Sequence, residues 1–489
     1  MSKSKLQTSI ATHYRRYALG SVLTLAAGFI SFPITTRLLS TEQFGILGYW
    51  EAWILLLTAL LKLGAGDTMM RFYPHGGDER QKVRHATNFV MLPALLGAAV
   101  WVVALVVVGV FSTTGVIDTP TAAFAALTIV LLSVVVSHVM WAMGTLELSG
   151  LSTIVNVTWR WLGVGATLGF LFFVDQTAMG VFMARIAMTF LVAVWLVRWI
   201  FRQMRFELAV VDWAYAKEGM RYGVPLAMKE LSGVVLGFID RIMLRWLLND
   251  FSAVGVYTIG FGLASYVDML VTAALGQAWT PMANRLYNEH GAAAVRESKR
   301  KLLRPLVYVC VGLAVTIAIG GRDFVLLIAG ADKLAAAPVF VVASISLLSL
   351  PVLSTCGMGL LLERRSGTLF ALTLAAAAIN VALNYIMIPR FGVMGATVST
   401  CASQITLHIA VYLFCSRPLR CLPASDVLIR ALLSAILCLS VVKYSGAMSN
   451  SSLGFRIVAC GFFVMLFYIV PVVVTDRRIR SIFKLKHPL

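Results

Sequence analysis

The segment from Met228 to Trp246 is apolar enough to cross a membrane, yet it carries five charged residues. A charge near the bilayer centre costs about 2.5–3.5 kcal/mol on insertion scales, so such side chains usually face a wet cavity or a partner. At 100° per residue, all five fall on one helix face that spans about 160°. They are Lys229, Glu230, Asp240, Arg241 and Arg245. This clustering predicts a membrane helix with one face toward a polar cavity.

Other apolar segments repeat this arrangement, with polar residues gathered on one helix face. In the segment 151–173, Asn156 and Arg160 share a face, and Arg160 lies near the middle of the segment. In the segment 253–275, the shared face carries Tyr257, Thr258 and Asp268. Charged groups and irregular polar surface at membrane depth must be buried in protein or lie against water. Several helices are therefore expected to line one cavity.

Four carboxylates lie at membrane depth, and the sequence leaves two roles open for them. They are Glu51, Glu230, Asp240 and Asp268. Each can neutralise a cation as a structural counter-ion, or one of them can bind a coupling proton or sodium ion. Asp268 is the stronger candidate for coupling because its helix face carries no basic residue. Lys62, near the inner end of its segment, is expected to extend to the membrane surface, and Arg185 is expected to be structural.

The composition is that of a multi-pass membrane protein. Of 489 residues, 59% are hydrophobic and 13% are charged, whereas soluble domains are about 45–50% apolar and about 25% charged. Windows of about 20 apolar residues give about fourteen predicted spans. They lie at residues 17–36, 44–63, 86–111, 121–143, 151–173, 178–199, 222–247, 253–275, 303–320, 338–362, 368–388, 395–415, 427–446 and 453–475.

The distribution of basic residues predicts the orientation of these spans. Of the 41 Lys and Arg residues, 29 lie in or at the edge of the loops on one side, against five on the other. Basic loops stay in the cytoplasm, so both termini are expected there. The same bias explains the net charge of +19 without nucleic acid, for which no basic-aromatic module is present. Seven scattered cysteines show no metal-ligand spacing, and we expect no metal, no cofactor and no catalytic residues.

An internal repeat predicts how the spans are organised. Gly45 and Gly255 follow the first and the seventh span at an offset of about 210 residues, and Gly180 and Gly395 share nearly the same offset. The expected fold is all-α, with two pseudo-symmetric six-helix bundles around a central cavity plus an extra helix pair. The expected domains are residues 1–221, residues 222–424, and the helix pair with a basic tail, residues 425–489. Transporters built from such repeats bind substrate near the bilayer midplane.

Two stretches carry a family resemblance that extends over essentially the whole chain. These are "LLSTEQFGILG" (38–48) and "INVALNYIMIPRFGVMGATVST" (379–400). With about fourteen spans, the chain resembles the polysaccharide-transporter branch of the multidrug/oligosaccharidyl-lipid/polysaccharide exporter superfamily, which includes Wzx-type flippases. The resemblance implies a bacterial inner membrane, alternating access, and translocation of undecaprenyl-diphosphate-linked oligosaccharides for exopolysaccharide or O-antigen assembly. It also implies membrane lipid as the surroundings of the site, and a polymerase and export machinery as partners.

This resemblance assigns roles to the polar faces. A guanidinium binds phosphate oxygens in pairs, so the cations are expected to hold the diphosphate, while amide, hydroxyl and aromatic groups contact the sugars. The expected substrate-binding residues are Arg160, Lys229, Arg241, Asn156, Tyr257 and Thr258. The alternatives are a multidrug cation antiporter of the same superfamily, a lipid II flippase, and a membrane polysaccharide polymerase. The loops are too short for the external catalytic domain that a polymerase needs. A coupling proton, a sodium ion or the membrane potential remain alternatives as the driving force.

Overall fold

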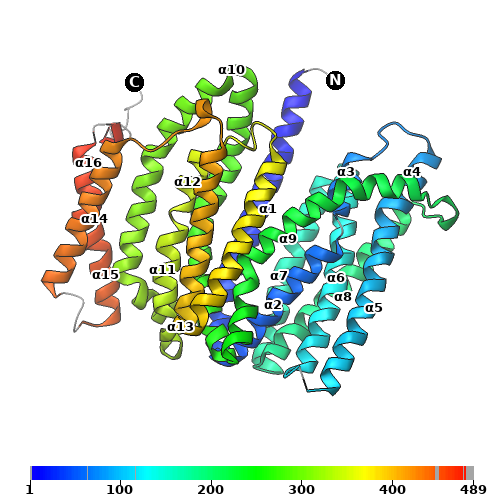
Figure 1. The fold of residues 1–489 in the computed structure, drawn as a ribbon, viewed down its shortest axis with the longest axis horizontal. Helices are drawn as coiled ribbons and strands as arrows, with labels where there is room; N and C mark the ends of the chain where they lie inside the picture. Colours follow the sequence, from blue (N-terminus) through cyan, green and yellow to red (C-terminus); the bar gives the residue numbers. More distant parts are fainter. Residues whose placement is uncertain (1–2, 63, 116, 447–450, 477, 481–489) are drawn as a thin grey trace. The chain divides into compact units, whose positions relative to one another are not determined.

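The computed structural model describes residues 3–62, 64–115, 117–446, 451–476 and 478–480. Among these residues the chain is helical apart from short connections and contains no β-strand, which confirms the predicted all-α membrane fold (Figure 1). The predicted basic tail beyond Arg480 lies outside the described residues.

Sixteen α-helices follow one another along the described chain. They are α1 (Lys3–Leu38), α2 (Thr41–Leu61), α3 (Ala65–Arg71), α4 (Glu79–Ala86), α5 (Leu92–Thr113), α6 (Pro120–Thr145), α7 (Ser149–Phe173), α8 (Ala178–Gln203), α9 (Trp213–Leu248), α10 (Phe251–Ala329), α11 (Ala337–Leu347), α12 (Leu350–Gly357), α13 (Ser366–Phe414), α14 (Ser425–Ser445), α15 (Leu453–Val464) and α16 (Val470–Thr475). Single π-helical turns join α4 to α5 and α15 to α16.

Each of the predicted spans falls on one or more of these helices. Ten helical stretches of the described chain are long and apolar enough to cross a membrane. The number is smaller than the number of predicted spans partly because α13 holds two of them, separated by a kink at Gly392 with φ of 55°. A residue without Cβ adopts this positive φ without strain. α9 is also outside the ten, as expected for a helix with five charges between residues 229 and 245.

The chain divides into two compact units, unit 1 (Met1–Arg245) and unit 2 (Trp246–Leu489). Almost all of α9 therefore packs with unit 1, although the predicted domain boundary lies at residues 221 and 222. Packing and internal duplication are different properties, so the predicted repeat stays a prediction.

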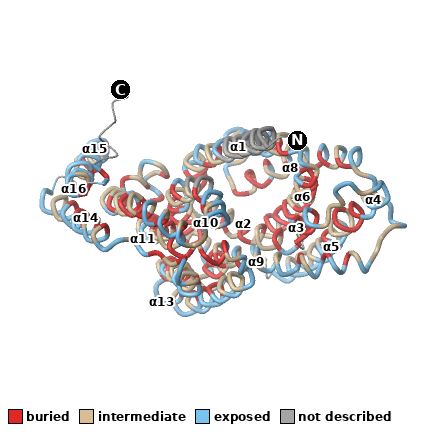
Figure 2. The backbone as a smooth tube through the Cα atoms, turned by 90° about the horizontal axis from the view of Figure 1, so that it is seen from above, coloured by how far each residue is buried: buried red, intermediate tan, exposed pale blue. Residues whose placement is uncertain are grey.

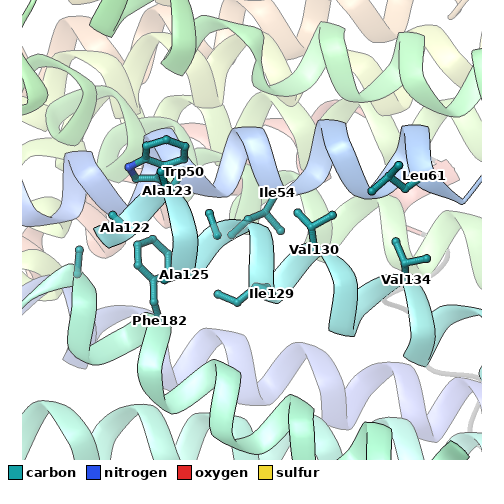
Figure 3. Close-up of a cluster of buried hydrophobic side chains, with 12 residues drawn as sticks. Trp50, Ile54, Leu61, Ala122, Ala123, Ala125, Ile129, Val130, Val134 and Phe182 are labelled. Atoms are coloured by element: carbon teal, nitrogen blue, oxygen red, sulfur yellow. The ribbon is translucent and has the colours of Figure 1, made fainter. Parts of the chain in front are cut away.

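The core of unit 1 forms where α2, α6 and α8 meet. Trp50 and Ile54 of α2 pack against Ile129 and Val130 of α6, and Phe182 of α8 closes the cluster (Figure 3). These residues recur at helical spacing on one face of each helix, which is the pattern that brings apolar stripes together. The cluster fixes the side-by-side arrangement of the helices that carry Glu51 and Arg185.

A close approach of two glycines positions α9 within unit 1. Gly64, at the bend between α2 and α3, has φ of 66°, and a Cβ on it would lie 2.1 Å from the backbone oxygen of Gly223 in α9. The hydroxyl of Thr68 donates to the backbone oxygen of Gly219 at 3.4 Å. Only glycine permits this separation, so the α2–α3 bend sets the height at which the charged face of α9 lies.

Unit 2 has two clusters of buried side chains. In the first, Tyr308 and Val315 of α10 pack against Val427 of α14 and Tyr468 beside α15. This cluster joins the last three helices to α10. In the second, Trp279 of α10 packs with residues from the segments around α12 and the end of α13, which include Leu362, Cys415 and Leu419.

Burial patterns within each unit indicate which helices face lipid. The most apolar part of the stretch that contains α5 has a mean hydropathy of 2.7, yet only 6% of it is buried, against 56% for α6. Figure 2 shows the exposed residues along the outer sides of helices such as α13 and α14, with buried residues between helices. An apolar surface of this extent is typical of contact with a membrane or another protein, and with ten apolar helices of spanning length it supports the multi-pass membrane assignment.

Candidate substrate site

Arg160 lies on an open face of α7. This 25-residue helix carries Arg160 at its middle, and Asn156 lies one turn earlier on the same face. Both side chains are exposed. A Cβ on Gly163, three residues further along this face, would meet no atom of the described residues within 4 Å. The described protein therefore leaves this face of α7 uncovered around Arg160.

Arg160 and Asn156 are also without partners in that space. Among the described residues, neither forms a hydrogen bond or an ion pair. A charge at membrane depth needs water or an anion, and a planar guanidinium pairs best with a carboxylate or phosphate. The open face of α7 can thus bind an anionic group, with an amide beside it to accept or donate a hydrogen bond.

The charged face of α9 divides into an open part and a closed part. Lys229 is half-buried and forms no ion pair among the described residues. A Cβ on Gly233 or Gly237, which share its face, would likewise meet no described atom within 4 Å. Lys229 thus belongs to the open part of the face.

Asp240 and Arg241 belong to the closed part. Asp240 is completely buried, and 7% of Arg241 is exposed. The Arg241 guanidinium lies over the ring of Phe238 at 4.8 Å and donates to the backbone oxygen of Gly237 at 3.2 Å. Arg241 is therefore placed to hold packing in this structure, and a ligand would reach it only after a rearrangement.

Two carboxylates of unit 1 pair with cations on neighbouring helices. Glu230 of α9 accepts from Lys62 at the end of α2 at 3.2 Å. The expectation that Lys62 extends to the membrane surface stays a prediction; in this structure a carboxylate lies within its reach. Arg185 of α8 donates to Glu51 of α2, and one-third of each side chain is exposed. Arg185 thus belongs to the polar surface of unit 1 that carries Glu51, and Glu51 is its counter-ion in this structure.

A buried, uncharged network occupies unit 2. The amide of Asn380 donates to the hydroxyl of Thr400 at 3.2 Å, and Asn384 donates to the side-chain oxygen of Asn380 at 3.2 Å. The hydroxyl of Tyr257 donates to Thr400 at 3.4 Å, and its ring stacks on Phe261. Tyr257 is fully buried, so in this structure it joins α10 to α13 and does not face a ligand.

On α10, Asp268 and Thr258 each have one buried side-chain oxygen without a hydrogen-bond partner among the described residues. These atoms are Oδ1 of Asp268 and the hydroxyl oxygen of Thr258. A buried carboxylate oxygen without a partner is costly when ionised. A proton or a bound cation would remove this cost, which is the chemistry that a coupling site needs.

The site residues that the sequence did not predict are the partners across helices. Lys62 and Arg185 both lie in apolar segments. Their partners on other helices can be recognised only when the positions of the residues along neighbouring helices are compared. Gln43 accepts from the backbone nitrogen of Ala178 at 2.9 Å, so these two positions lie level. Glu51 and Arg185 follow them by eight and seven residues, which places both about two turns further in. Among the described residues no group of three or more His, Cys, Asp or Glu could hold a metal ion.

A multi-pass helical protein with cations on open faces at membrane depth has the features of the membrane transporter class. The chain belongs to the polysaccharide biosynthesis protein family, whose model matches residues 16–287. This membership confirms the family resemblance seen in the sequence. A search among curated proteins gives no match.

Solved structures share the fold at low identity. The lipid II flippase MurJ in an inward closed conformation is 11% identical, with a TM-score of 0.76 over 94% of this chain and 99% of that chain. An inward-facing multidrug resistance MATE family transporter of the MOP superfamily is 14% identical, with a TM-score of 0.62 over 80% and 93%. A MOP superfamily transporter from Pyrococcus furiosus, described by a binding pocket of reverse polarity, is 13% identical, with a TM-score of 0.55 over 82% and 94%.

Proposed function

We propose that this protein is a flippase for undecaprenyl-diphosphate-linked oligosaccharide repeat units. It moves them from the inner to the outer leaflet of the bacterial inner membrane, where they enter exopolysaccharide or O-antigen assembly. The family supports the polysaccharide pathway, and the fold similarity to MurJ supports a lipid-linked substrate. In this proposal both termini lie in the cytoplasm, as the distribution of basic residues predicts. A polymerase and export machinery act on the product.

The observation that carries the proposal is the open, unneutralised Arg160. A diphosphate carries at least two negative charges, and its oxygens match the donor fork of a guanidinium. Asn156, one turn away, offers an amide to the phosphate or to the first sugar. The polyprenyl chain stays in lipid, so only the polar head needs a protein environment during the crossing.

Lys229 is the second cation of the proposed site. Its face of α9 is unfilled at Gly233 and Gly237, which leaves room for bulky sugars beside the charge. Glu51 and Glu230 are already paired with Arg185 and Lys62. Positive charge therefore dominates among the unpaired groups of unit 1, as an anionic substrate requires. In the proposed cycle, the site is open alternately to the two sides of the membrane.

This balance of charge favours a flippase over a cation antiporter. A multidrug antiporter binds cations and needs unpaired carboxylates, whereas the unpaired groups on the open faces of α7 and α9 are cationic. A lipid II flippase needs the same diphosphate contacts, so only the sugar part of the substrate distinguishes it. A polymerase would need a catalytic site, whereas the solved structures that share this fold are transporters and a flippase.

Charge reversal at Arg160 tests the proposal. In cells that lack their own flippase but make the lipid-linked repeat unit, Arg160→Glu should abolish polymer export, and the repeat unit should accumulate on the cytoplasmic side. Arg160→Lys should retain part of the activity because the charge remains without the fork. Arg296→Glu, an exposed residue of α10, is the control and should export normally. Normal export by Arg160→Glu at wild-type protein levels would refute the assignment.

Asp268 is proposed as the coupling group of unit 2. Asp268→Asn keeps the size of the side chain but cannot release a proton or attract a cation. Transport in vesicles should then lose its dependence on an imposed proton or sodium gradient. Asp323→Asn is the control, because Asp323 is paired with Arg456 at 2.7 Å. Unchanged ion dependence in Asp268→Asn would assign the driving force elsewhere, for example to the membrane potential.

A further inference from the structure

The connection between α8 and α9, residues 204–212, is held firmly against α4 and the turn that follows it (Figure 1). The backbone nitrogen of Glu207 donates to the hydroxyl of Thr87 at 3.1 Å. The side chain of Asn88 donates to the backbone oxygen of Val210 at 3.3 Å and accepts from the backbone nitrogen of Asp212 at 2.9 Å. Thr87 and Asn88 are buried. The connection is therefore a well-ordered segment with defined hydrogen bonds, and we call residues 204–212 the ledge.

An ion pair anchors the far end of the ledge. Arg84 contacts Asp212 at 2.5 Å and lies over the ring of Tyr215 at 4.4 Å. The backbone nitrogen of Tyr215 donates to Asp212, and this bond, together with Arg84, holds the pKa of Asp212 below its usual value. Asp212 thus stays ionised and paired, and it does not neutralise the exposed cations nearby.

The ledge and the helix ends beside it display large apolar side chains. Phe201 at the end of α8 is 65% exposed, Leu208 is 70% exposed and Trp213 at the start of α9 is 64% exposed. Phe206 is half-buried: its ring packs against the core of unit 1 and meets the ring of Phe201 edge-on at 5.3 Å. The described residues leave most of Phe201, Leu208 and Trp213 uncovered. These three side chains are therefore available to lipid or to a partner. Trp beside a span end is typical of the membrane–water interface.

Exposed cations flank these apolar side chains on both sides. They are Arg198, Arg202, Arg205, Lys217 and Arg221. Within the described part of the chain, none of them pairs with a carboxylate. Arg198 and Arg202 lie one turn apart on α8, and Lys217 and Arg221 lie one turn apart on α9. Glu207 and Glu218 are the exposed carboxylates of the same region, so a net positive charge of three remains, counted as five cations less two carboxylates.

We propose that this ledge is a binding site for anionic phospholipid headgroups of the membrane in which the protein lies. Leu208, Trp213 and Phe201 enter the upper acyl region, while the flanking cations contact lipid phosphates. Clusters of four or more Lys and Arg beside a span are attracted to anionic lipid surfaces, and apolar side chains add to that binding. A soluble acidic partner would not need three uncovered apolar side chains at the end of a membrane helix. This site is independent of the proposed transport site at Arg160.

Lipid titration of the purified full chain tests the site. The probes are phosphatidylglycerol and phosphatidylcholine in detergent micelles, with binding measured as the shift of the thermal unfolding midpoint. Wild type should be stabilised by phosphatidylglycerol and much less by phosphatidylcholine. The variant R202Q/R205Q/K217Q should need about tenfold more phosphatidylglycerol for the same shift, because each cation contributes several-fold to the affinity. The control R296Q/R300Q/K301Q removes three exposed cations of α10 and should behave as wild type.

Two further measurements make the outcome specific to this surface. Brominated phosphatidylglycerol quenches nearby tryptophan fluorescence, so the quenched fraction should fall in Trp213→Phe. Soluble glycerol phosphate should not reproduce the thermal shift. The proposal is overturned if R202Q/R205Q/K217Q responds to phosphatidylglycerol as wild type does. It is also overturned if the two lipids stabilise equally, or if glycerol phosphate alone gives the full shift.

Discussion

Unit 1 and unit 2 place polar groups at membrane depth in different ways. In unit 1 the polar groups are charged, paired between helices, and partly open to the surroundings, as in Glu51 with Arg185. In unit 2 they are mostly neutral and fully buried, as in the network of Asn380, Asn384 and Thr400. The first arrangement allows partners to be exchanged for a ligand, whereas the second specifies one way of packing.

Buried charged side chains of unit 2 also have hydrogen-bond partners. Lys299 is fully buried and donates to the backbone oxygens of Leu419 at 2.9 Å and Cys356 at 3.3 Å. Asp476, 1% exposed, accepts from Tyr308 at 2.8 Å and from Arg304. These groups hold helix ends together. Asp268 differs from them: one of its oxygens is buried without a hydrogen-bond partner among the described residues, and no described cation forms an ion pair with it.

The largest effect on stability is expected at Asp476. Asp476→Ala leaves the Tyr308 hydroxyl and part of the Arg304 guanidinium without an acceptor, and loss of one partner from a buried pair costs about 3–5 kcal/mol. Thermal unfolding in detergent measures the change. Asp426→Ala is the matched control, because Asp426 also binds Arg304 but is 42% exposed. Equal losses of stability in the two variants would contradict this prediction, because they would show that burial of the carboxylate does not determine its contribution.

The same residue predicts a pH dependence. Burial opposes the charge of Asp476, but hydrogen bonds from Tyr308 and Arg304 outweigh it and hold the pKa of Asp476 below its usual value. A carboxylate with a lowered native pKa stabilises the fold fully above its ordinary pKa of about 4, and this contribution is lost as the pH falls through the native value. Wild type should therefore lose more unfolding free energy than Asp476→Ala on acidification below about pH 4. Parallel pH profiles would contradict the assignment.

A smaller loss is expected in the neutral network. Asn380→Leu removes the donor to Thr400 and the acceptor of the Asn384 amide from the buried network, at about 1–3 kcal/mol. Asn384→Leu removes the end of the chain of hydrogen bonds and keeps the bond between Asn380 and Thr400, so it should cost less. Thermal unfolding of both variants gives the comparison. Equal losses in the two variants would contradict this order and would show that contacts outside this network determine the contribution of the two amides.

The helices of both units could be predicted from the sequence because their signal is local. Long apolar windows mark the spans, and each predicted span falls on one or more helices. The face of α9 that carries Lys229 follows from the helical period, which needs no knowledge of neighbours. Its glycines do mark open space, because nothing described lies within 4 Å of a Cβ at Gly233 or Gly237.

The pairing of charges could not be predicted in the same way. Lys62 and Glu230 are 168 residues apart, and Glu51 and Arg185 are 134 residues apart. A helical wheel orders residues within one helix and contains no information about the helix opposite. Burial of Arg241 and Tyr257 likewise depends on which helices pack against them. The same limit explains why these two residues, predicted to bind substrate, lie in packed interior.

The smallest change in stability is expected for the pair of Glu51 and Arg185 in unit 1. Arg185→Glu places two carboxylates together and should destabilise by about 1–2 kcal/mol, less than a fully buried pair because one-third of each side chain is exposed. The swap E51R/R185E restores opposite charges and should recover most of this loss. Thermal unfolding of the two single variants and the swap gives the coupling energy. If transport recovers together with stability, the pair only holds α2 against α8. If stability recovers and transport does not, the position of each charge matters to the substrate, and the open arrangement of unit 1 extends from Arg160 to this pair.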